Sequence, residues 1–270
     1  MMMDEEAILA AYAKDGYAVI PEMLSAEELM ALNTFIDRDR QENSEDWHAP
    51  RQGAAGNGQV LLRHPEWDRF VRHPRMMSLF TRILGSDVRF AQYDFREVAP
   101  DASDHSGMQW HRDVSFYGKV GGALWDPENP YHSTYACAIY YLSDVHDCCP
   151  CFAMVPASHE FRTLEEAKRT LGPHYRETPL RGPAGTAILY NITTWHTRVS
   201  GATTCPHGRR TMHVYQSRKG NAPLTEWARI PEALALSGDA ETRAYYSQWT
   251  PGQIAFARET YESPIPTWYP

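Results

Sequence analysis

The spacing of apolar residues changes once along this chain, near residue 87, and this change restricts the possible folds more than any other feature. Before it, apolar side chains recur at helical intervals; after it, they alternate with period two in short runs. One such run starts at Val88 and ends by Pro100, and others cover 135–142, 152–155, 186–191 and 210–217. Because no helices alternate regularly with these runs, a double-sheet β fold is favoured over a parallel α/β sheet.

The residues before this change are expected to be mainly helical. Asp4 is a candidate cap for a helix over 5–14, and Ser25 with Glu28 has capping-box spacing ahead of a helix to about residue 42. Residues 17–20 have the pattern of a short strand, and 65–85 carry further helix. The polar, Gly-rich stretch 44–60 predicts a mobile loop.

The whole chain, 1–270, is expected to form one domain, because no repeat or linker divides the sequence. We expect a helical N-terminal part of about 1–86, a β core of about 87–220 and a helical tail of about 221–270. Within the tail, short helices are expected at 241–248 and 253–261.

Charge and composition exclude several classes of protein. Asp and Glu outnumber Lys and Arg by 34 to 26, a formal charge of −8, which disfavours a nucleic-acid partner. No apolar run reaches the length of a membrane span, and the acidic start lacks the basic region of a signal peptide. We therefore expect a cytoplasmic protein with no membrane partner. Its five cysteines are an odd count, so a disulfide framework is not expected.

Three separated segments carry candidate chemistry. His111 and Asp113 have His-x-Asp spacing at a strand end, which places both side chains on one face. A strand delivers His196 about 83 residues later. Two histidines and one carboxylate form the facial triad of non-haem Fe(II) oxygenases, which leaves the opposite face of the metal open. The pattern alone is weak, since the chain has 12 histidines and His-x-Asp arises often by chance.

An arginine follows His196 at the start of the last predicted strand. Guanidinium is always charged and binds a carboxylate through a planar fork, so Arg209 is a candidate anchor for the far carboxylate of a 2-oxo diacid. Arg210 is the alternative, and neighbouring strand residues face opposite ways, so only one of the two can enter a pocket. Arg209 is favoured by its position.

Together these segments resemble the phytanoyl-CoA dioxygenase family, which depends on Fe(II) and 2-oxoglutarate. Residues 15–21, DGYAVIP, are similar to the N-terminal element of that family, and 144–159 resemble its central stretch. The matches run in the family's order over most of 7–217. Two departures are Ala157, where the family has glycine, and the turn from Asp147 to Pro150. A third is a longer stretch between the distal histidine and the arginine.

The resemblance implies a double-stranded β-helix, a jelly-roll or cupin-like core with flanking helices. It implies that His111, Asp113 and His196 hold Fe(II), with 2-oxoglutarate and O₂ as co-substrates. Arg209 would bind 2-oxoglutarate, and Gln92 would add a polar contact to it.

The implied activity is hydroxylation, or a related oxidation, of a C–H bond in a small molecule such as a natural-product or metabolite intermediate. The aspartate ligand argues against chlorination, because halogenases of the superfamily leave that position open for halide. Phe116 and Tyr117, just after the aspartate, are candidate substrate contacts, although as aromatics they also suit a core. The partner expected is the substrate alone, with a monomer or homodimer left open.

Other readings of the same residues remain open. A metal-bound, cupin-like binding protein without turnover would keep the triad but need no arginine anchor. A zinc hydrolase would use the triad without O₂. His146, Cys148, Cys149 and Cys151 could also hold zinc, since Cys148 and Cys151 have Cys-x₂-Cys spacing. No second such pair follows, so reduced, partly buried thiols are the favoured account.

Overall fold

A computed structural model describes residues 4–47, 54–98, 109–113, 131, 133–202, 205–218 and 231–246, and all structural statements below concern these residues. Phe116 and Tyr117 lie outside the described residues, as does the helix expected at 253–261. No described helix is both long and apolar enough to cross a lipid bilayer.

The N-terminal helices follow the sequence signals closely. Helix α1, Glu5–Asp15, ends at Gly16, whose φ of 79° is left-handed, a conformation that glycine adopts freely. Asp4 occupies its N-cap, but the aspartate side chain makes no capping hydrogen bond. Helix α2, Ala26–Glu42, begins with the expected capping box between Ser25 and Glu28. The remaining longer helices are α5, Pro74–Leu84, and α6, Leu164–Leu171.

Short helical turns fill the spaces between these elements. They are η1 (Ser44–Asp46), α3 (Val60–Arg63), η2 (Pro65–Trp67), α4 (Asp68–Val71), η3 (Ser158–Glu160), η4 (Gly172–His174), α7 (Glu232–Ala235) and α8 (Ala240–Tyr246). The tail is therefore helical where it is described, as expected.

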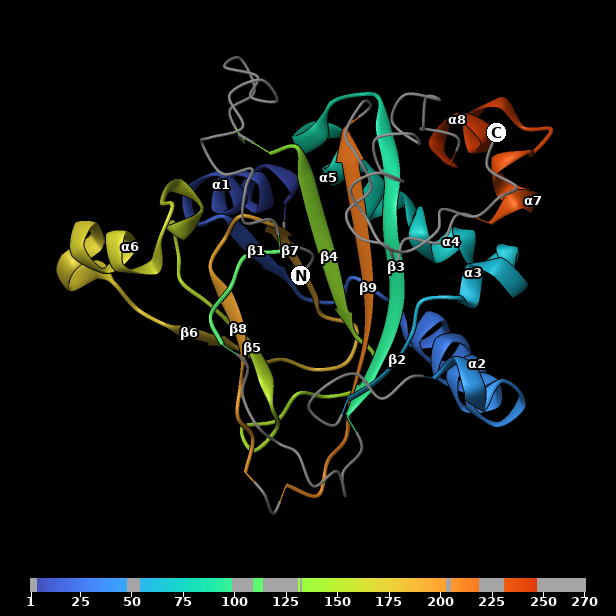
Figure 1. Ribbon diagram of the computed structural model, residues 1–270, viewed down its shortest axis with the longest axis horizontal. Helices are drawn as coiled ribbons and strands as arrows, with labels where there is room; N and C mark the ends of the chain where they lie inside the picture. Colours follow the sequence, from blue (N-terminus) through green and yellow to red (C-terminus); the bar gives the residue numbers. More distant parts are fainter. Residues whose placement is uncertain are drawn as a thin grey trace, which may run out of the picture.

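Two antiparallel sheets form the core of the molecule (Figure 1). The larger has the order β1-β7-β4-β9-β3-β2 and the smaller the order β6-β5-β8. The strands are β1 (Tyr17–Ile20), β2 (Ala54–Asn57), β3 (Val88–Val98), β4 (Tyr135–Tyr141), β5 (Cys151–Met154), β6 (Thr178–Leu180), β7 (Ala187–Asn191), β8 (His196–Val199) and β9 (Arg209–Arg218). This arrangement confirms the expected jelly-roll core with N-terminal and flanking helices.

Three strands were not expected from the sequence. Residues 54–57, part of the predicted loop, form β2, which pairs with the end of β3 from Asn57↔Phe95 to Ala54↔Val98. The backbone groups at the edge of β3 need hydrogen-bond partners, and β2 supplies them. The Gly-rich sequence of residues 54–57 has no alternation that would predict this strand. β6 and β8 are the other two, with three and four residues.

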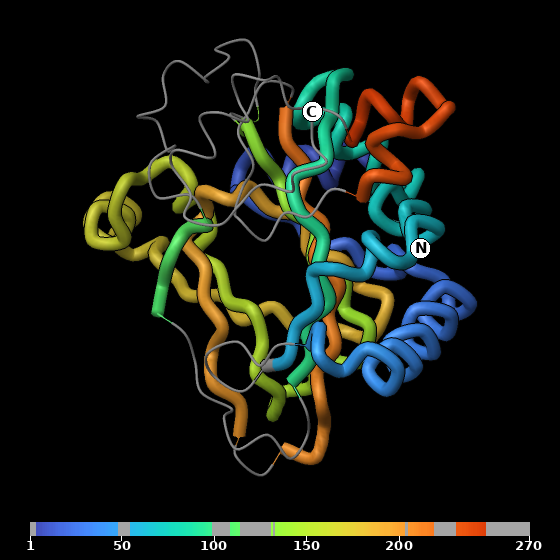
Figure 2. Tube along the Cα trace, turned by 45° about the vertical axis from the view of Figure 1, so that its right-hand side comes forward, coloured from blue at the N-terminus to red at the C-terminus, as the bar shows by residue number. Residues whose placement is uncertain are grey.

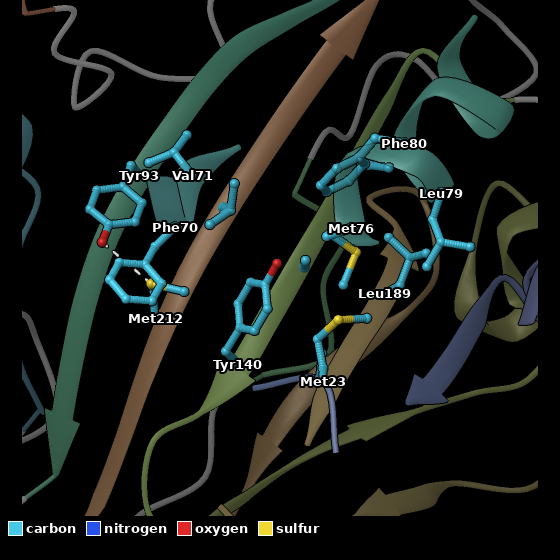
Figure 3. Close-up of a cluster of buried hydrophobic side chains, with 14 of the residues drawn as sticks. Met23, Phe70, Val71, Met76, Leu79, Phe80, Tyr93, Tyr140, Leu189 and Met212 are labelled. Carbon is cyan, nitrogen blue, oxygen red and sulfur yellow. Dashed lines mark hydrogen bonds between the residues drawn. The ribbon is translucent and has the colours of Figure 1, made fainter. Parts of the chain in front are cut away.

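The main apolar core lies between the larger sheet and the helices that cover one of its faces, while the smaller sheet lies on the other side (Figure 2). Figure 3 shows this core, where Met76 and Phe80 of α5 approach the strands. Tyr93 of β3 and Met212 of β9 both belong to it, and the Tyr93 hydroxyl lies 3.3 Å from the Met212 sulfur. The helices thus cover the outer face of the sheet, while the inner face carries a second buried hydrophobic cluster that includes Ile139 and Ile188.

The cysteines depart from the expected set of reduced thiols. Cys148 and Cys205 are bonded as a disulfide, with their Cα atoms 5.3 Å apart, whereas Cys137, Cys149 and Cys151 are free and buried. The pairing joins residues 57 positions apart and depends on a loop that folds back, since the Ala202 amide donates to the Cys148 carbonyl at 2.8 Å. Sequence spacing gives no sign of such a return.

Candidate metal centre

Three predicted side chains converge between the two sheets. The potential ligand atoms of His111, Asp113 and His196 all lie within 4.8 Å of one another. His196 Nε2 is 3.4 Å from Asp113 Oδ1, and the two imidazole centroids are 4.4 Å apart. The structure therefore brings together the three residues predicted to bind iron.

The backbone fixes this convergence. His111 and His196 form an isolated antiparallel bridge, in which each amide donates to the other's carbonyl at 3.0 and 2.9 Å. The Asp113 amide donates to the Ile192 carbonyl at 3.1 Å. Because side chains two residues apart on an extended segment face the same way, His111 and Asp113 both point toward the start of β8.

Each histidine is oriented by its second ring nitrogen. Nδ1 of His111 lies 2.8 Å from the Gln109 carbonyl, and Nδ1 of His196 lies 2.8 Å from the Thr194 carbonyl. A carbonyl accepts only, so both Nδ1 atoms carry a proton, and the two Nε2 atoms are the ones that face a metal. Metal-binding histidines usually have such a partner on the nitrogen that faces away from the ion.

The carboxylate is held in its charged form. The Tyr190 hydroxyl donates to Asp113 Oδ2 at 2.7 Å. Burial by itself would raise the Asp113 pKa, but the neighbouring His196 and its hydrogen bond lower the pKa overall. Burial lowers the pKa of His111, with a further contribution from His196. Burial alone would lower the pKa of His196, but the neighbouring Asp113 raises that pKa overall, so a metal ion that binds Nε2 would displace a proton.

The two adjacent arginines of β9 face opposite sides of the sheet. Arg209 is 5% exposed and points inward, where its Nη1 donates to the Pro150 carbonyl at 2.9 Å. Arg210 points outward and forms ion pairs with Asp37 and Glu97. The favoured arginine is thus the one that lies inside the barrel.

Arg209 lies one aromatic ring away from the metal-ligand group. Its guanidinium carbon is 5.5 Å from the centroid of Phe152, and the same ring is 6.5 Å from the His196 ring. Burial lowers the Arg209 pKa to about 10, so the group is still a cation at neutral pH. Within the described residues no carboxylate pairs with it, and its Nε has no hydrogen-bond partner. A buried cation without an anion is a site for an anionic ligand.

Gln92 also lies on the inner face, opposite Tyr215 in the register of β3 and β9. It is 7% exposed, and its Nε2 donates to Asp94 Oδ2 at 2.7 Å. The structure therefore places Gln92 inside the barrel, where its amide supports a neighbouring carboxylate.

Sequence reasoning missed two further polar residues on this face. Arg96 donates from Nε to Asp94 Oδ1 at 2.6 Å; burial opposes its charge, but Asp94, with a smaller contribution from Asp113, raises the Arg96 pKa overall. Burial, followed by the charge of Arg96, lowers the His213 pKa to about 3. The available signal was the alternation of β3 itself, because Gln92, Asp94 and Arg96 form a polar stripe at every second position. Only the first of them was singled out.

The model of the family described as phytanoyl-CoA dioxygenase (PhyH) matches residues 12–211. The chain belongs to the phytanoyl-CoA dioxygenase family. This match covers both metal-ligand segments and the start of β9, and it confirms the resemblance inferred from the motifs. It also confirms an enzyme of the Fe(II)- and 2-oxoglutarate-dependent dioxygenase class that acts on a small molecule.

Curated and solved relatives of this family member are distant. A protein named ectoine dioxygenase from Nocardia farcinica (strain IFM 10152) is 22% identical over 225 residues, which is 73% of each chain. The epimerase SnoN from nogalamycin biosynthesis, described as non-heme and alpha ketoglutarate dependent, aligns with a TM-score of 0.62 at 21% identity, covering 80% of this chain and 81% of its own. The carbocyclase SnoK gives the same TM-score and identity, covering 80% and 85%. At this identity the structural likeness shows the shared fold.

Proposed function

We propose that this family member hydroxylates a C–H bond of a small organic substrate, with His111, Asp113 and His196 holding Fe(II) and Arg209 anchoring 2-oxoglutarate. The observation that carries the proposal is that a preorganised His-Asp-His group lies near a buried arginine that has no carboxylate partner among the described residues. Only the Phe152 ring separates the two. A metal-binding protein without turnover has no need of that second feature.

The donor set fits iron. Two imidazoles and one carboxylate match the facial triad of non-haem Fe(II) oxygenases, and such a triad leaves coordination positions for a co-substrate. When bound, iron with 2-oxoglutarate supplies the oxidising chemistry that protein side chains lack. The chain contributes the orientation of the ligands, through the Gln109 and Thr194 carbonyls and the Tyr190 hydroxyl.

Arg209 gives the site its preference for a diacid. Its fork can form two parallel hydrogen bonds with a carboxylate, and the surrounding burial strengthens them. The Pro150 carbonyl and the Phe152 ring hold the guanidinium in place before the ligand arrives. A 2-oxo diacid that chelates the metal at one end would reach this cation with its other end.

Four other residues have proposed roles in binding 2-oxoglutarate or the substrate. We propose that Gln92 adds a polar contact near 2-oxoglutarate, and that Arg96 presents a second cation from β3. Phe116 and Tyr117 are proposed substrate contacts on sequence grounds alone. The single-domain organisation and a monomeric or homodimeric state also remain proposals.

Hydroxylation is favoured over halogenation because Asp113 occupies the position that a halide would need. Relatives of the same fold have other outcomes, since SnoN is named an epimerase and SnoK a carbocyclase. Both are described as belonging to nogalamycin biosynthesis, which supports a natural-product or metabolite intermediate as the substrate class here.

The test is stimulated turnover of 2-oxoglutarate. The Fe(II)-loaded chain is incubated with O₂, 2-oxoglutarate and a panel of small molecules, and succinate is measured together with the mass of each candidate product. A substrate should stimulate succinate formation and gain one oxygen atom. Product formation without O₂ would instead support the zinc hydrolase, and binding of small molecules without succinate would support the non-catalytic binding protein.

A further inference from the structure

A second group of metal-binding side chains lies away from the His-Asp-His triad. The sulfur atoms of Cys148, Cys149 and Cys205 all lie within 4.8 Å of one another, and we call these three residues the sulfur cluster. Cys149 and Cys205 are buried, and Cys148 is partly exposed. The cluster differs from the knuckle suggested by sequence spacing, because Cys205 takes the place of Cys151.

We propose that the reduced sulfur cluster binds one thiophilic ion, zinc or copper(I), with an imidazole from His146 or His207 as a further ligand. The proposal concerns a site separate from the iron centre and does not depend on the function proposed above.

The distance between Cys149 and Cys205 is close to that of two thiolates on one ion. A Zn–S bond is about 2.3 Å, so two thiolates on a tetrahedral ion are separated by about 3.8 Å. Cys149 Sγ lies 3.6 Å from Cys205 Sγ, within hydrogen-bonding distance and close to this separation. Three cysteines with one histidine are a common donor set of structural zinc sites, and soft thiolates also select copper(I).

Backbone contacts hold the two cysteine-bearing segments together whether or not an ion is present. The Ala202 amide donates to the Cys148 carbonyl at 2.8 Å, and the Cys205 amide donates to the Ala202 carbonyl at 2.9 Å. Gly201 makes this approach possible, because a Cβ there would lie 2.6 Å from the Pro150 nitrogen and 2.7 Å from the Cys148 carbonyl oxygen. The absence of a side chain at 201 is therefore a requirement of the cluster geometry.

Two imidazoles come from the segments that carry the cysteines. His146 is two residues before Cys148, and His207 is two residues after Cys205. Their ring centroids are 4.2 Å apart, and both side chains are exposed. In the disulfide-bonded structure neither ring belongs to the sulfur group, so one of these exposed side chains would turn toward the cluster when an ion binds.

The disulfide between Cys148 and Cys205 is the alternative state of the same residues. Two sulfurs joined by a bond are no longer thiolates, so the ion and the disulfide exclude each other. An organic disulfide such as oxidised glutathione converts one state to the other. Two cluster thiols are oxidised to the Cys148–Cys205 bond, the reagent is reduced to two thiols, and the ion leaves.

The cluster also adjoins the proposed co-substrate anchor. Pro150 directly follows Cys149, and its carbonyl accepts the hydrogen bond from Arg209 Nη1. An ion on the cluster would fix the turn that carries this carbonyl.

The test measures metal content and spectrum of the reduced chain. Wild type, Cys149→Ala and Cys151→Ala are reduced, freed of reductant without air, and loaded with zinc or cobalt(II). Because Cys151 is a nearby buried cysteine outside the cluster, it is the matched control. We expect wild type and Cys151→Ala to retain one more zinc ion per chain than Cys149→Ala, and a sulfur-to-cobalt charge-transfer band that Cys149→Ala lacks. The iron site has no sulfur, so this band reports the cluster alone.

Two further arms use the wild-type chain, so that a folding defect in a variant leaves the proposal testable. A thiol-specific mercurial should release one zinc ion as three thiols react, and oxidised glutathione should release the same ion. His146→Ala combined with His207→Ala should weaken zinc binding by about tenfold or more. Equal zinc content in all three chains, no sulfur-to-cobalt band, or thiol modification without zinc release would overturn the site. Unchanged affinity in the double histidine variant would overturn the imidazole ligand.

Discussion

Replacing Arg209 by glutamine should separate the binding of 2-oxoglutarate from the stability of the chain. In the ligand-free protein this guanidinium is buried without a carboxylate partner among the described residues. Its pKa falls from 12.5 to about 10, and at about 1.4 kcal/mol per pKa unit the charged form is disfavoured by roughly 3 kcal/mol. Removing the charge relieves this cost, while loss of the bond to the Pro150 carbonyl costs about 1 kcal/mol.

The free energy of unfolding should therefore change by no more than about 2 kcal/mol, in either direction. Binding should respond much more strongly. Two charge-assisted hydrogen bonds to a buried carboxylate contribute about 3–4 kcal/mol, which corresponds to a loss of about 10²–10³ in 2-oxoglutarate affinity. Iron affinity should stay the same, because the Phe152 ring lies between Arg209 and His196 of the triad.

The adjacent Arg210→Gln variant is the matched control. It removes the same charge from the same strand, but on the outer face, where Arg210 pairs with Asp37 and Glu97. We expect a stability loss of about 1 kcal/mol and unchanged 2-oxoglutarate binding. Calorimetric titration of the Fe(II)-loaded chains without O₂ measures both affinities. A larger loss of affinity in Arg210→Gln than in Arg209→Gln would refute the assignment and the reasoning from strand register.

Three other predictions concern stability and metal binding. His213 has a folded-state pKa of about 3, against an ordinary value of 6.5, so the unfolded chain binds a proton first as pH falls. The free energy of unfolding then falls below pH 6.5, by about 2 kcal/mol at pH 5. Denaturant titrations at several pH values should show a smaller fall in His213→Gln than in wild type or in the exposed control His174→Gln. An equal fall in the three chains would contradict this prediction. Tyr190→Phe removes the hydroxyl that donates to the carboxylate ligand, so iron affinity measured by competition with a chelator should fall about tenfold or more; an unchanged affinity would remove this positioning role. Ala157 has a φ of 62°, in the left-handed region that glycine adopts more easily, so Ala157→Gly should raise the free energy of unfolding by about 1 kcal/mol. If urea denaturation gives a lower free energy of unfolding for the variant, this strain is absent.

The site was largely predictable because its parts are local in sequence or fixed by alternation. His-x-Asp spacing puts two ligands on one face whatever the rest of the chain does. Which of Arg209 and Arg210 faces inward is shown only by the structure of β9, in which Arg209 pairs with Val98 and is buried. A residue at the start of a strand has too few neighbours in sequence to reveal its face.

What escaped prediction depends on contacts between distant segments. β2 forms because its backbone pairs with the edge of β3. The sulfur cluster forms because the segment at Gly201 packs closely against Cys148 and Pro150. Arg96 was visible as part of an alternating polar stripe, but its proximity to Asp113 requires the barrel to close. Tertiary packing determines these contacts, and local sequence propensity does not predict them.

The most direct test of the central claim is an anaerobic visible titration of the metal-free chain with Fe(II) and then with 2-oxoglutarate. If the triad holds iron and Arg209 anchors the co-substrate, a weak metal-to-ligand charge-transfer band will appear only when both are present. The band will require a much higher 2-oxoglutarate concentration in Arg209→Gln. Iron that binds without producing a band at any 2-oxoglutarate concentration would contradict the account.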